Sequence, residues 1–202
     1  MKTTLFILTS VAAMSLVSCD NPAEKSTEAN TSEAKAVPTG EASGQKWEFT
    51  DQSTITFVGS KVTGSHDGGF KKFSGHFHVD GETLAASGHK VVIDMSSLYS
   101  DSEKLTGHLK SPDFFDVANN PEATFVATSF KDDTLTGNLN LLGVEKSIEF
   151  PVKVDKSDDA IRITADFFIN RFDFDIKYAG KTDDLIRKEV VIKLDLHATP
   201  AK

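Results

Sequence analysis

The stretch IRITADFFIN, at residues 161–170, alternates apolar and polar side chains along most of its length. A β-strand points successive side chains to opposite faces of its sheet, so a period of two indicates a strand with one buried face. The same alternation recurs at 73–79, 148–154 and 190–197. This recurrence predicts an all-β domain.

Applied to the whole chain, the alternation predicts eight strands, at 54–60, 70–79, 88–95, 123–130, 133–142, 147–155, 160–169 and 189–198. Short polar connections at Asp132–Asp133, at 144–146 and at 156–159 predict an antiparallel meander for strands five to seven. Eight such strands close most simply into an antiparallel up-and-down barrel of the lipocalin-like kind. A two-sheet sandwich is the alternative.

A short helical excursion is predicted between strands four and five. It occupies the 27 residues from Ser96 to Glu122, far more than a hairpin requires. Asp101 or Ser102 can cap a helix, and Pro112 is typical of the start of a second helical turn. The pair Phe114–Phe115 that follows is expected to fold inward, so we interpret the excursion as a lid over one end of the barrel.

The N-terminus is typical of an export signal. A short apolar run follows Lys2, too short to span a bilayer, and the chain's one cysteine, Cys19, comes directly after it. The sequence LVSC at 16–19 resembles the bacterial lipoprotein box, in which the thiol is acylated and becomes the first mature residue. We therefore expect residues 1–18 to be a signal peptide, and Cys19 to be a lipid anchor in the bacterial cell envelope, on the periplasmic side of the inner or outer membrane.

Residues 19–45 are predicted to be a disordered tether, because Val37 is the one large apolar residue after Cys19 in this segment. Residues 46–202 are of single-domain length. With 22 basic and 30 acidic residues, the chain has a net charge of -8, which disfavours nucleic acid as a partner. Since no second cysteine exists for a disulfide, the domain must be held together by its core.

Three longer motifs resemble those of the YceI-like family: HLKSPDFFDV at 108–117, GNLNLLGVEKSIEFPV at 137–152 and INRFDFDIKY at 169–178. The resemblance covers residues 47–198 in the same order. It implies an extended, lipocalin-like antiparallel barrel and an exported protein that holds a polyisoprenoid chain, such as an isoprenoid quinone, inside it. Thr106–Gly107 stands where the family often has Arg-Asp, and Asp175 where it often has glycine.

Phenylalanine dominates the aromatic residues, with 15 Phe against 2 Tyr and 1 Trp, which favours apolar surfaces without polar groups. The predicted lining of a ligand cavity is Phe57, Phe73, Phe77, Phe125, Leu139, Phe150, Ile163 and Phe167 from the strands, and Phe114 and Phe115 from the lid. His108 and Arg171 are candidates for contacting a ligand head group. The alternatives are that His108 packs or caps the lid and that Arg171 pairs with a carboxylate in a turn.

No metal or catalytic residues are predicted. His76 and His78 share a strand face opposite the apolar side, so we expect a solvated pair and not a metal site. No nucleophile beside a base is visible as a local motif, and no cofactor is required apart from a bound polyisoprenoid or isoprenoid quinone. Two alternatives remain: a small envelope enzyme acting on a lipid-like substrate through His108 and Asp113, and a transmembrane β-barrel with reversed alternation.

Overall fold

The structure is a computed structural model that describes residues 21–40, 42–182 and 184–202. The expected signal peptide (1–18) and the expected lipidation site, Cys19, lie outside these residues and stay predictions. Within the described residues the helical elements are α1 (Glu103–Lys110) and the 3-10 helices η1 (Pro22–Lys25), η2 (Met95–Ser97) and η3 (Arg171–Phe174). No helix in this part of the chain is long and apolar enough to cross a membrane.

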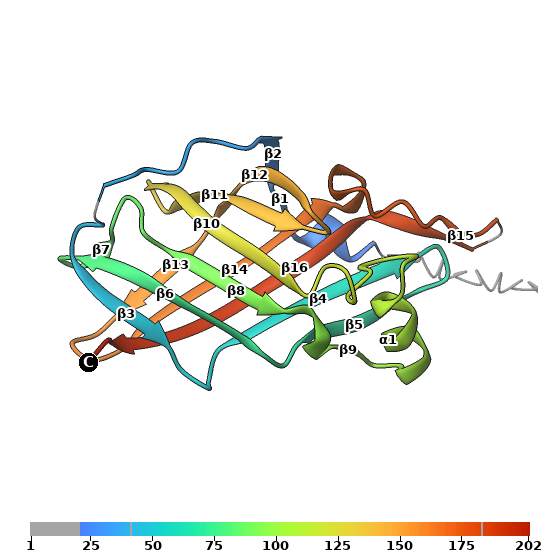
Figure 1. The fold of residues 1–202 in the computed structure, drawn as a ribbon, viewed down its shortest axis with the longest axis horizontal. Coiled ribbons are helices and arrows are strands. Elements are labelled where there is room, and N and C mark those ends of the chain that lie inside the picture. Colours follow the sequence, from blue (N-terminus) through green and yellow to red (C-terminus); the bar gives the residue numbers. More distant parts are fainter. Residues whose placement is uncertain (1–20, 41, 183) are drawn as a thin grey trace, which may run out of the picture.

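Sixteen strands form one connected sheet (Figure 1). They are β1 (Thr27–Glu28), β2 (Asn30–Glu33), β3 (Gln45–Phe49), β4 (Thr54–Lys61), β5 (Gly64–Phe70), β6 (Phe73–Asp80), β7 (Thr83–Leu84), β8 (Lys90–Asp94), β9 (Leu98–Ser100), β10 (Glu122–Lys131), β11 (Thr134–Leu141), β12 (Val144–Pro151), β13 (Lys153–Lys156), β14 (Ile161–Asn170), β15 (Gly180–Lys181) and β16 (Asp184–Pro200).

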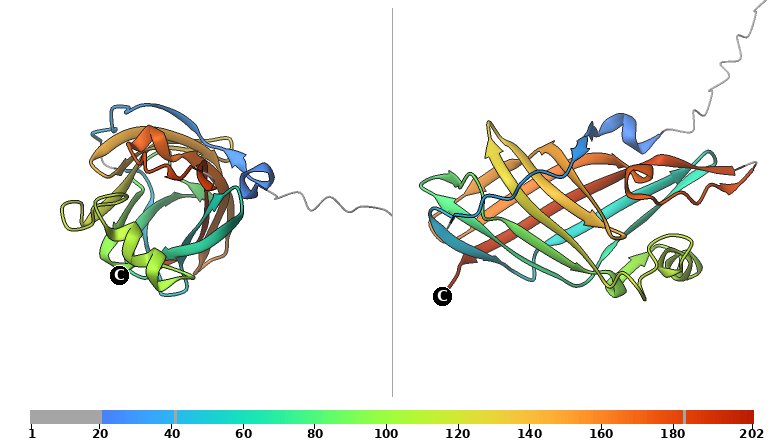
Figure 2. Two further views of the ribbon diagram at one scale, coloured as in Figure 1. Left: turned by 90° about the vertical axis from the view of Figure 1, so that its right-hand side faces the viewer. Right: turned by 45° about the horizontal axis from the view of Figure 1, so that its top comes forward.

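The main path through the sheet runs β2-β12-β11-β10-β8-β6-β3-β16-β4-β5-β9, and β14 pairs with the other edge of β16. Every ladder is antiparallel except the short parallel pairing of β1 with β14. Seen along its long axis, the sheet curls around a common interior (Figure 2). The all-β, antiparallel prediction is confirmed. The predicted count of eight is not matched strand for strand, and the main path through the described residues is open, with ends at β2 and β9.

β16 is the central strand of the sheet. It pairs with β14 over ten positions, from Ile161–Ala198 to Asn170–Glu189, and its other edge pairs with β3 and β4. Ile163 and Leu196, which form one of these pairs, are buried in the core, whereas Arg162 is exposed on the opposite face. The apolar face of the alternation therefore points inward, the reverse of what the transmembrane-barrel alternative requires.

Some strands lie in segments with little alternation. β5 has the sequence GSHDGGF, which offers no apolar period. Gly68 of β5 lies beneath the ring of Phe57 on β4, and a Cβ at this position would stand 2.3 Å from the ring carbon Cζ. Glycine is therefore required here for close packing. Because glycine contributes no apolar side chain to the alternation, the strand is not predicted from the sequence pattern.

One turn lies elsewhere than predicted. The connection expected at 144–146 belongs to β12, and the chain reverses at Leu142–Gly143, whose φ angles are 55° and 76°. A two-residue hairpin turn of this kind needs positive φ at both central positions, and glycine meets that need without strain. The meander itself is confirmed, since β11 pairs with β12 and β13 pairs with β14, both antiparallel.

The helical excursion joins β8 to β10, the third and fourth of the predicted strands, not the fourth and fifth. It contains η2, β9 and α1. The helix α1 begins after Ser102, as expected, and the hydroxyl of Ser102 accepts a hydrogen bond from the amide of Leu105 at 3.4 Å. The turn that follows folds Phe114 into the core. The excursion lies at one end of the curled sheet (Figure 2, left).

Residues 21–35, here called the N-terminal arm, lie along the sheet, although a disordered tether was predicted for 19–45. The arm bridges two strand edges, because β1 pairs with β14 and β2 pairs with β12. Ala29 is buried, and the side chain of Asn138 accepts a hydrogen bond from the amide of Lys35 (2.9 Å) and donates one to its carbonyl (2.7 Å). The arm thus satisfies the otherwise unpaired edge of β12, which its own composition does not reveal.

We predict that Asn138→Ala releases the arm. The substitution removes both hydrogen bonds to Lys35 and a third to Glu145, each with a net value of about 1 kcal/mol. Amide hydrogen exchange in residues 27–35, measured by mass spectrometry, should accelerate by roughly ten- to a hundredfold. Asn140→Ala on the same strand is the matched control, because Asn140 makes no side-chain hydrogen bond within the described residues. Unchanged exchange in the Asn138 variant would contradict this account of the arm.

Candidate functional site

A cavity of about 480 Å³ lies inside the curled sheet. Its walls come from the inward faces of β4, β6, β8, β10, β11, β12, β14 and β16, and α1 with the turn after it covers one end. The lining is almost entirely aliphatic and aromatic. A concave, apolar site of this size fits a small hydrophobic ligand or part of a longer one.

Most of the predicted lining residues face this cavity. Those that do are Phe57, Phe77, Phe114, Phe115, Phe125, Leu139, Phe150, Ile163 and Phe167. Phe73 does not line it, which corrects the prediction for this residue. The ring of Phe73 packs edge-on against Phe49, with 6.2 Å between centroids. That the remaining residues contact a ligand stays a prediction.

Three aromatic rings form a continuous wall across three strands. Phe125 of β10 lies 5.8 Å from Phe150 of β12, measured between ring centroids. Phe150 stacks on Phe167 of β14 at 4.0 Å with 15° between the ring planes. No ladder in the described residues joins β12 directly to β14. The stacked pair therefore adds a side-chain contact between two strands that no ladder joins directly.

Several lining residues were missed, although the sequence carried a signal for some of them. Ile192, Leu194 and Leu196 of β16 all line the cavity. They occupy the apolar positions of the alternation at 190–197, and this alternation by itself predicts that they lie on the inner face of the sheet. The basic residues Lys61 and Lys104 also line the cavity, and no local pattern indicates this, because they come from a strand end and a helix that only the fold brings together.

His89 is one of the buried polar residues of the wall, with Ser60 and Arg171. Its Nε2 is 2.8 Å from the carbonyl oxygen of Ala85, and its Nδ1 accepts a hydrogen bond from the amide of His78 at 3.1 Å. Burial lowers the pKa of the His89 imidazole to about 4. The ring is therefore neutral near pH 7, with the proton on Nε2, and all its polar atoms have partners.

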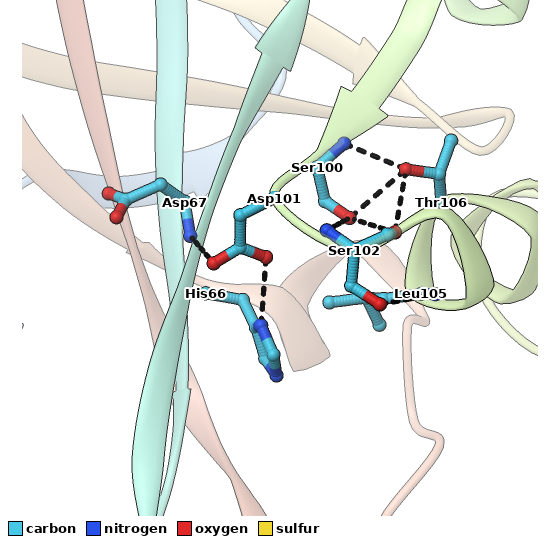
Figure 3. Close-up of polar contacts among 7 residues, drawn as sticks. All are labelled: His66, Asp67, Ser100, Asp101, Ser102, Leu105 and Thr106. Atoms are coloured by element: carbon cyan, nitrogen blue, oxygen red, sulfur yellow. Dashed lines mark hydrogen bonds and ion pairs between the residues drawn. The ribbon is translucent and has the colours of Figure 1, made fainter.

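The lid is attached to the sheet by a polar cluster that surrounds Ser100 and Asp101 (Figure 3). The carboxylate of Asp101 lies 2.9 Å from Nδ1 of His66 and accepts a hydrogen bond from the amide of Asp67 at 3.3 Å. The hydrogen bond to His66 is the main reason that the pKa of Asp101 is lowered. The hydroxyl of Thr106 accepts from the amide of Ser100 at 2.8 Å and donates to the carbonyl of Ser102 at 3.0 Å.

Thr106 stands at one of the positions where the sequence differs from the residues that the resemblance to the YceI-like family predicts. Its hydroxyl fastens the first turn of α1 to the end of β9, through both the amide and the hydroxyl of Ser100. In this chain the hydroxyl therefore helps to hold the lid. The neighbouring Gly107 has no heavy atom within 4 Å of where its Cβ would be, so that side of the helix is open.

His108 lines the cavity and packs the lid, and its contact with a head group stays a prediction. Its Nε2 is 3.0 Å from a carboxylate oxygen of Asp113. Its ring lies edge-on to Phe114 at 5.0 Å and to Tyr178 at 4.8 Å. The hydroxyl of Ser111 donates to the backbone carbonyl of His108, not to the imidazole. The pair needed by the enzyme alternative is thus present, but the Ser111 hydroxyl is not aimed as a nucleophile.

Arg171 has backbone partners where a carboxylate was expected. Its guanidinium donates to the carbonyl oxygens of Arg187 (3.0 Å), Ile186 (3.2 Å) and Ile176. The pairing of β16 with β4 is irregular between Ile186 and Val190, which leaves carbonyl groups there without ladder partners. Arg171 is 3% exposed and supplies the missing donors. The prediction that Arg171 pairs with a carboxylate in a turn is therefore wrong, because its partners are backbone carbonyls.

Asp175, the second departure from the family pattern, ends η3 with φ of 58°. This is the left-handed conformation that glycine adopts freely, and aspartate tolerates it better than most residues. The carboxylate pairs with Lys177 at 2.6 Å on the surface. The fold at this corner is thus kept without the glycine.

The histidine pair on β6 is half-buried, not fully solvated. The rings of His76 and His78 lie 5.6 Å apart, edge to face. The pKa of His76 is lowered, first by partial burial and then by the charge of Lys46. In the described residues, no group of three or more His, Cys, Asp or Glu side chains is placed to hold a metal ion.

Sequence comparison with known proteins gives a clear match. The profile of the YceI-like domain matches residues 47–198. A UPF0312 protein of Pseudomonas putida is 30% identical over 171 residues, which cover 76% of this chain and 88% of the relative. A UPF0312 protein of Enterobacter is 38% identical over 97 residues, but there the match spans 46% of this chain and 50% of the relative.

Solved structures share the fold. BcnA of Burkholderia cenocepacia is 25% identical, with a TM-score of 0.65, and the match covers 73% of this chain and 97% of that protein. A polyisoprenoid binding domain from Saccharophagus degradans is 18% identical, also with a TM-score of 0.65, and covers 79% of this chain and all of that domain, 100%.

We predict that His89 makes the fold sensitive to acid. The pKa of His89 is lowered from about 6.5 in the unfolded chain to about 4 in the fold. The unfolded state therefore takes up the proton first, and stability is lost as the pH falls through this window, by about 3 kcal/mol in total. His89→Gln keeps a donor and an acceptor but does not titrate. Denaturant unfolding should show that the free energy of unfolding falls less between about pH 7.5 and about pH 4 in this variant than in the wild type. An equal fall in both proteins would contradict the role of His89.

We predict that Arg171→Lys lowers the free energy of unfolding by about 2 to 3 kcal/mol, because one ammonium cannot reach three carbonyls held in different directions. Arg162→Lys is the matched control. Arg162 is exposed and pairs with both oxygens of Asp195 at 2.7 and 2.8 Å. Such a surface pair is worth at most about 1 kcal/mol. Chemical denaturation of both variants measures these changes in the free energy of unfolding. Similar losses in the two variants would contradict the structural role of Arg171.

Proposed function

The chain belongs to the YceI-like family, and from this membership and the apolar cavity we propose that it binds the hydrocarbon chain of an isoprenoid lipid, such as an isoprenoid quinone, inside the curled sheet. The observation that carries the proposal is the cavity of about 480 Å³, lined by aliphatic and aromatic side chains. The structural neighbour from Saccharophagus degradans is a polyisoprenoid binding domain, which points to the same ligand class.

We infer that the sheet forms an antiparallel barrel of eight strands. Six of its elements follow one another in the ladder as β12, β11, β10, β8, β6 and β3, which continues to β16 and then to β14. β14 pairs with β13, which continues β12 after Val152 alone. Three pairs of consecutive strands, β3 with β4, β5 with β6 and β12 with β13, can each be counted as one continuous strand. Counted in this way, the closed ring has eight strands. A barrel of eight strands is wide enough to hold one slender ligand.

Burial of hydrocarbon is sufficient to sustain such binding. If an isoprenoid tail loses on the order of 500 Å² of apolar surface to the cavity, the gain is roughly 12 kcal/mol. The cost of association is roughly 4 to 15 kcal/mol, so a long tail can bind without a charged anchor. Lys104, which is exposed at the mouth, and His108 are then placed to contact a head group, which is how the expected role of His108 fits the proposal.

An envelope location completes the proposal. If Cys19 is acylated, the domain is held at the periplasmic side of a bacterial membrane, where isoprenoid lipids are found. Storage, shielding or transport of the lipid are all compatible with a binding cavity. Catalysis is not needed for any of them, and the YceI-like family membership favours a binding protein.

The direct test is to identify the bound lipid. Full-length protein purified in mild detergent from its native host should release a prenyl lipid that lipid mass spectrometry detects. Protein stripped of lipid should take up ubiquinone added in detergent. Failure of both measurements would reject the proposal.

Filling the cavity should abolish uptake. We predict that Val91→Trp lowers bound ubiquinone by about tenfold or more, because Val91 of β8 lines the cavity and an indole takes up ligand space. Val92→Trp is the matched control, since Val92 does not line the cavity and alternation places it on the outer face. Thermal unfolding should show both variants folded, with changes of about 1 to 3 kcal/mol at most. Equal uptake by the two variants would show that the ligand binds elsewhere.

A further inference from the structure

Large apolar side chains are exposed at the mouth of the cavity. In the described residues, the exposed large hydrophobic side chains are Val37, Val62, Phe172, Tyr178 and Leu185. All of these except Val37 surround the end of the sheet where α1 lies. We call the set Val62, Phe172, Tyr178 and Leu185 the rim.

Each rim residue contacts another element at this end of the sheet. Val62, 50% exposed, is in the turn between β4 and β5, and its amide donates to the carbonyl of Leu185, 49% exposed, at 3.3 Å. Tyr178 contacts the lid, with its ring 5.1 Å from that of Phe114. Phe172 lies in η3 with its ring 4.6 Å from the guanidinium carbon of Arg171. Figure 2 (left) looks onto this end, where β15, the β4–β5 turn and α1 surround the opening.

The rim borders the cavity directly. Lys61 and Arg171, next to Val62 and Phe172 in the chain, both line the cavity, and so does Ile186, next to Leu185. The rim side chains themselves do not line it; they project outward from the loops. Exposed apolar groups in this position are a cost in water unless the surface meets an apolar partner.

One exposed basic residue at the mouth suits an anionic surface. The residues with a permanent charge that line the cavity are Lys61, Lys104 and Arg171. Lys61 pairs with Asp184, and Arg171 is buried against backbone carbonyls, so the exposed Lys104 is the one best placed to meet an anionic head group. Anionic lipid head groups attract such a residue when apolar side chains enter the bilayer beside it.

The first helical element lies close in sequence to the expected lipid anchor. Asn21 caps η1 by accepting a hydrogen bond from the amide of Ala23 at 3.2 Å, and Ala23 is buried. Cys19 precedes Asn21 by two residues, which at full extension span about 7 Å. A lipid on Cys19 would therefore hold the domain directly against the bilayer, with little slack. In Figure 2 (right), η1 lies in the half of the molecule that carries the rim.

We propose that the rim docks into a lipid bilayer, so that an isoprenoid chain passes between the membrane and the cavity without crossing water. This inference rests on the proposed function for its cargo, but docking itself requires only the rim. The occupant is a bilayer containing anionic phospholipid. A protein partner for the same surface is the competing outcome that the experiment must detect.

The first test locates the rim relative to the membrane. Leu185→Cys and, as control, Val37→Cys are made in the full-length chain, labelled with an environment-sensitive nitrobenzoxadiazole dye and reconstituted in vesicles of phosphatidylethanolamine and phosphatidylglycerol. Wild-type protein treated with the same dye is the control for labelling at Cys19. Val37, 43% exposed, matches Leu185 in exposure but belongs to the segment between β2 and β3. Spin-labelled lipids should quench the dye at position 185 several-fold more strongly than at 37; equal quenching would overturn the proposal.

The second test measures transfer. The double variant Val62→Ser/Leu185→Ser should slow ubiquinone transfer from donor vesicles by about tenfold, because less apolar surface enters the bilayer. The amount bound at equilibrium in detergent should stay unchanged, and Val37→Ser should transfer at the wild-type rate. Normal transfer by the double variant would refute docking through the rim. If wild-type protein neither binds ubiquinone nor releases a prenyl lipid, the proposed function fails, while the quenching experiment still decides whether the rim meets the membrane.

Discussion

The pairing of β16 with its two neighbours is the interaction on which the rest of the structure depends. One edge of this strand holds β14 along ten residues, and the other edge holds β3 and β4. The inward side chains of β16, among them Ile192 and Leu194, form one wall of the cavity. Where the ladder is irregular near Ile186, Arg171 supplies the donors that the neighbouring strand does not. Because the described chain holds no disulfide, this ladder and the core around it keep the two halves of the sheet together.

The same ladder explains how an apolar cavity can persist without collapse. Side chains on a paired strand cannot move inward independently, since the backbone is held at both edges, and the β-branched residues of the lining have few rotamers. The stacked rings of Phe150 and Phe167 add a rigid contact between β12 and β14. The space that remains costs stability in the empty protein, and a hydrocarbon ligand would recover part of that cost by restoring contacts to the wall. Stability and binding are therefore linked through the same side chains.

Three smaller elements lie around the central strands. The N-terminal arm covers the edges of β12 and β14, the lid is fastened through Asp101 and Thr106 and buries Leu109 and Phe114, and the rim surrounds the mouth. Segments at the margin of a fold open at lower free energy than its central strands, which the proposed exchange of a large ligand would require.

Much of this could be read from the sequence, for a physical reason. Side-chain direction in a strand is a local property, so alternation alone assigned most strands and placed Phe57, Phe150 and Phe167 on the inner face. Phe73 shows the limit, since its position in the alternation is correct but Phe49, from the neighbouring strand β3, packs against it. The order of the arm depends on Lys35 meeting Asn138, 103 residues away, and the partners of Arg171 depend on an irregular ladder in β16. The sequence by itself determined which side of each strand is apolar; the tertiary structure alone decided which segments meet, because those contacts join residues that no local period relates.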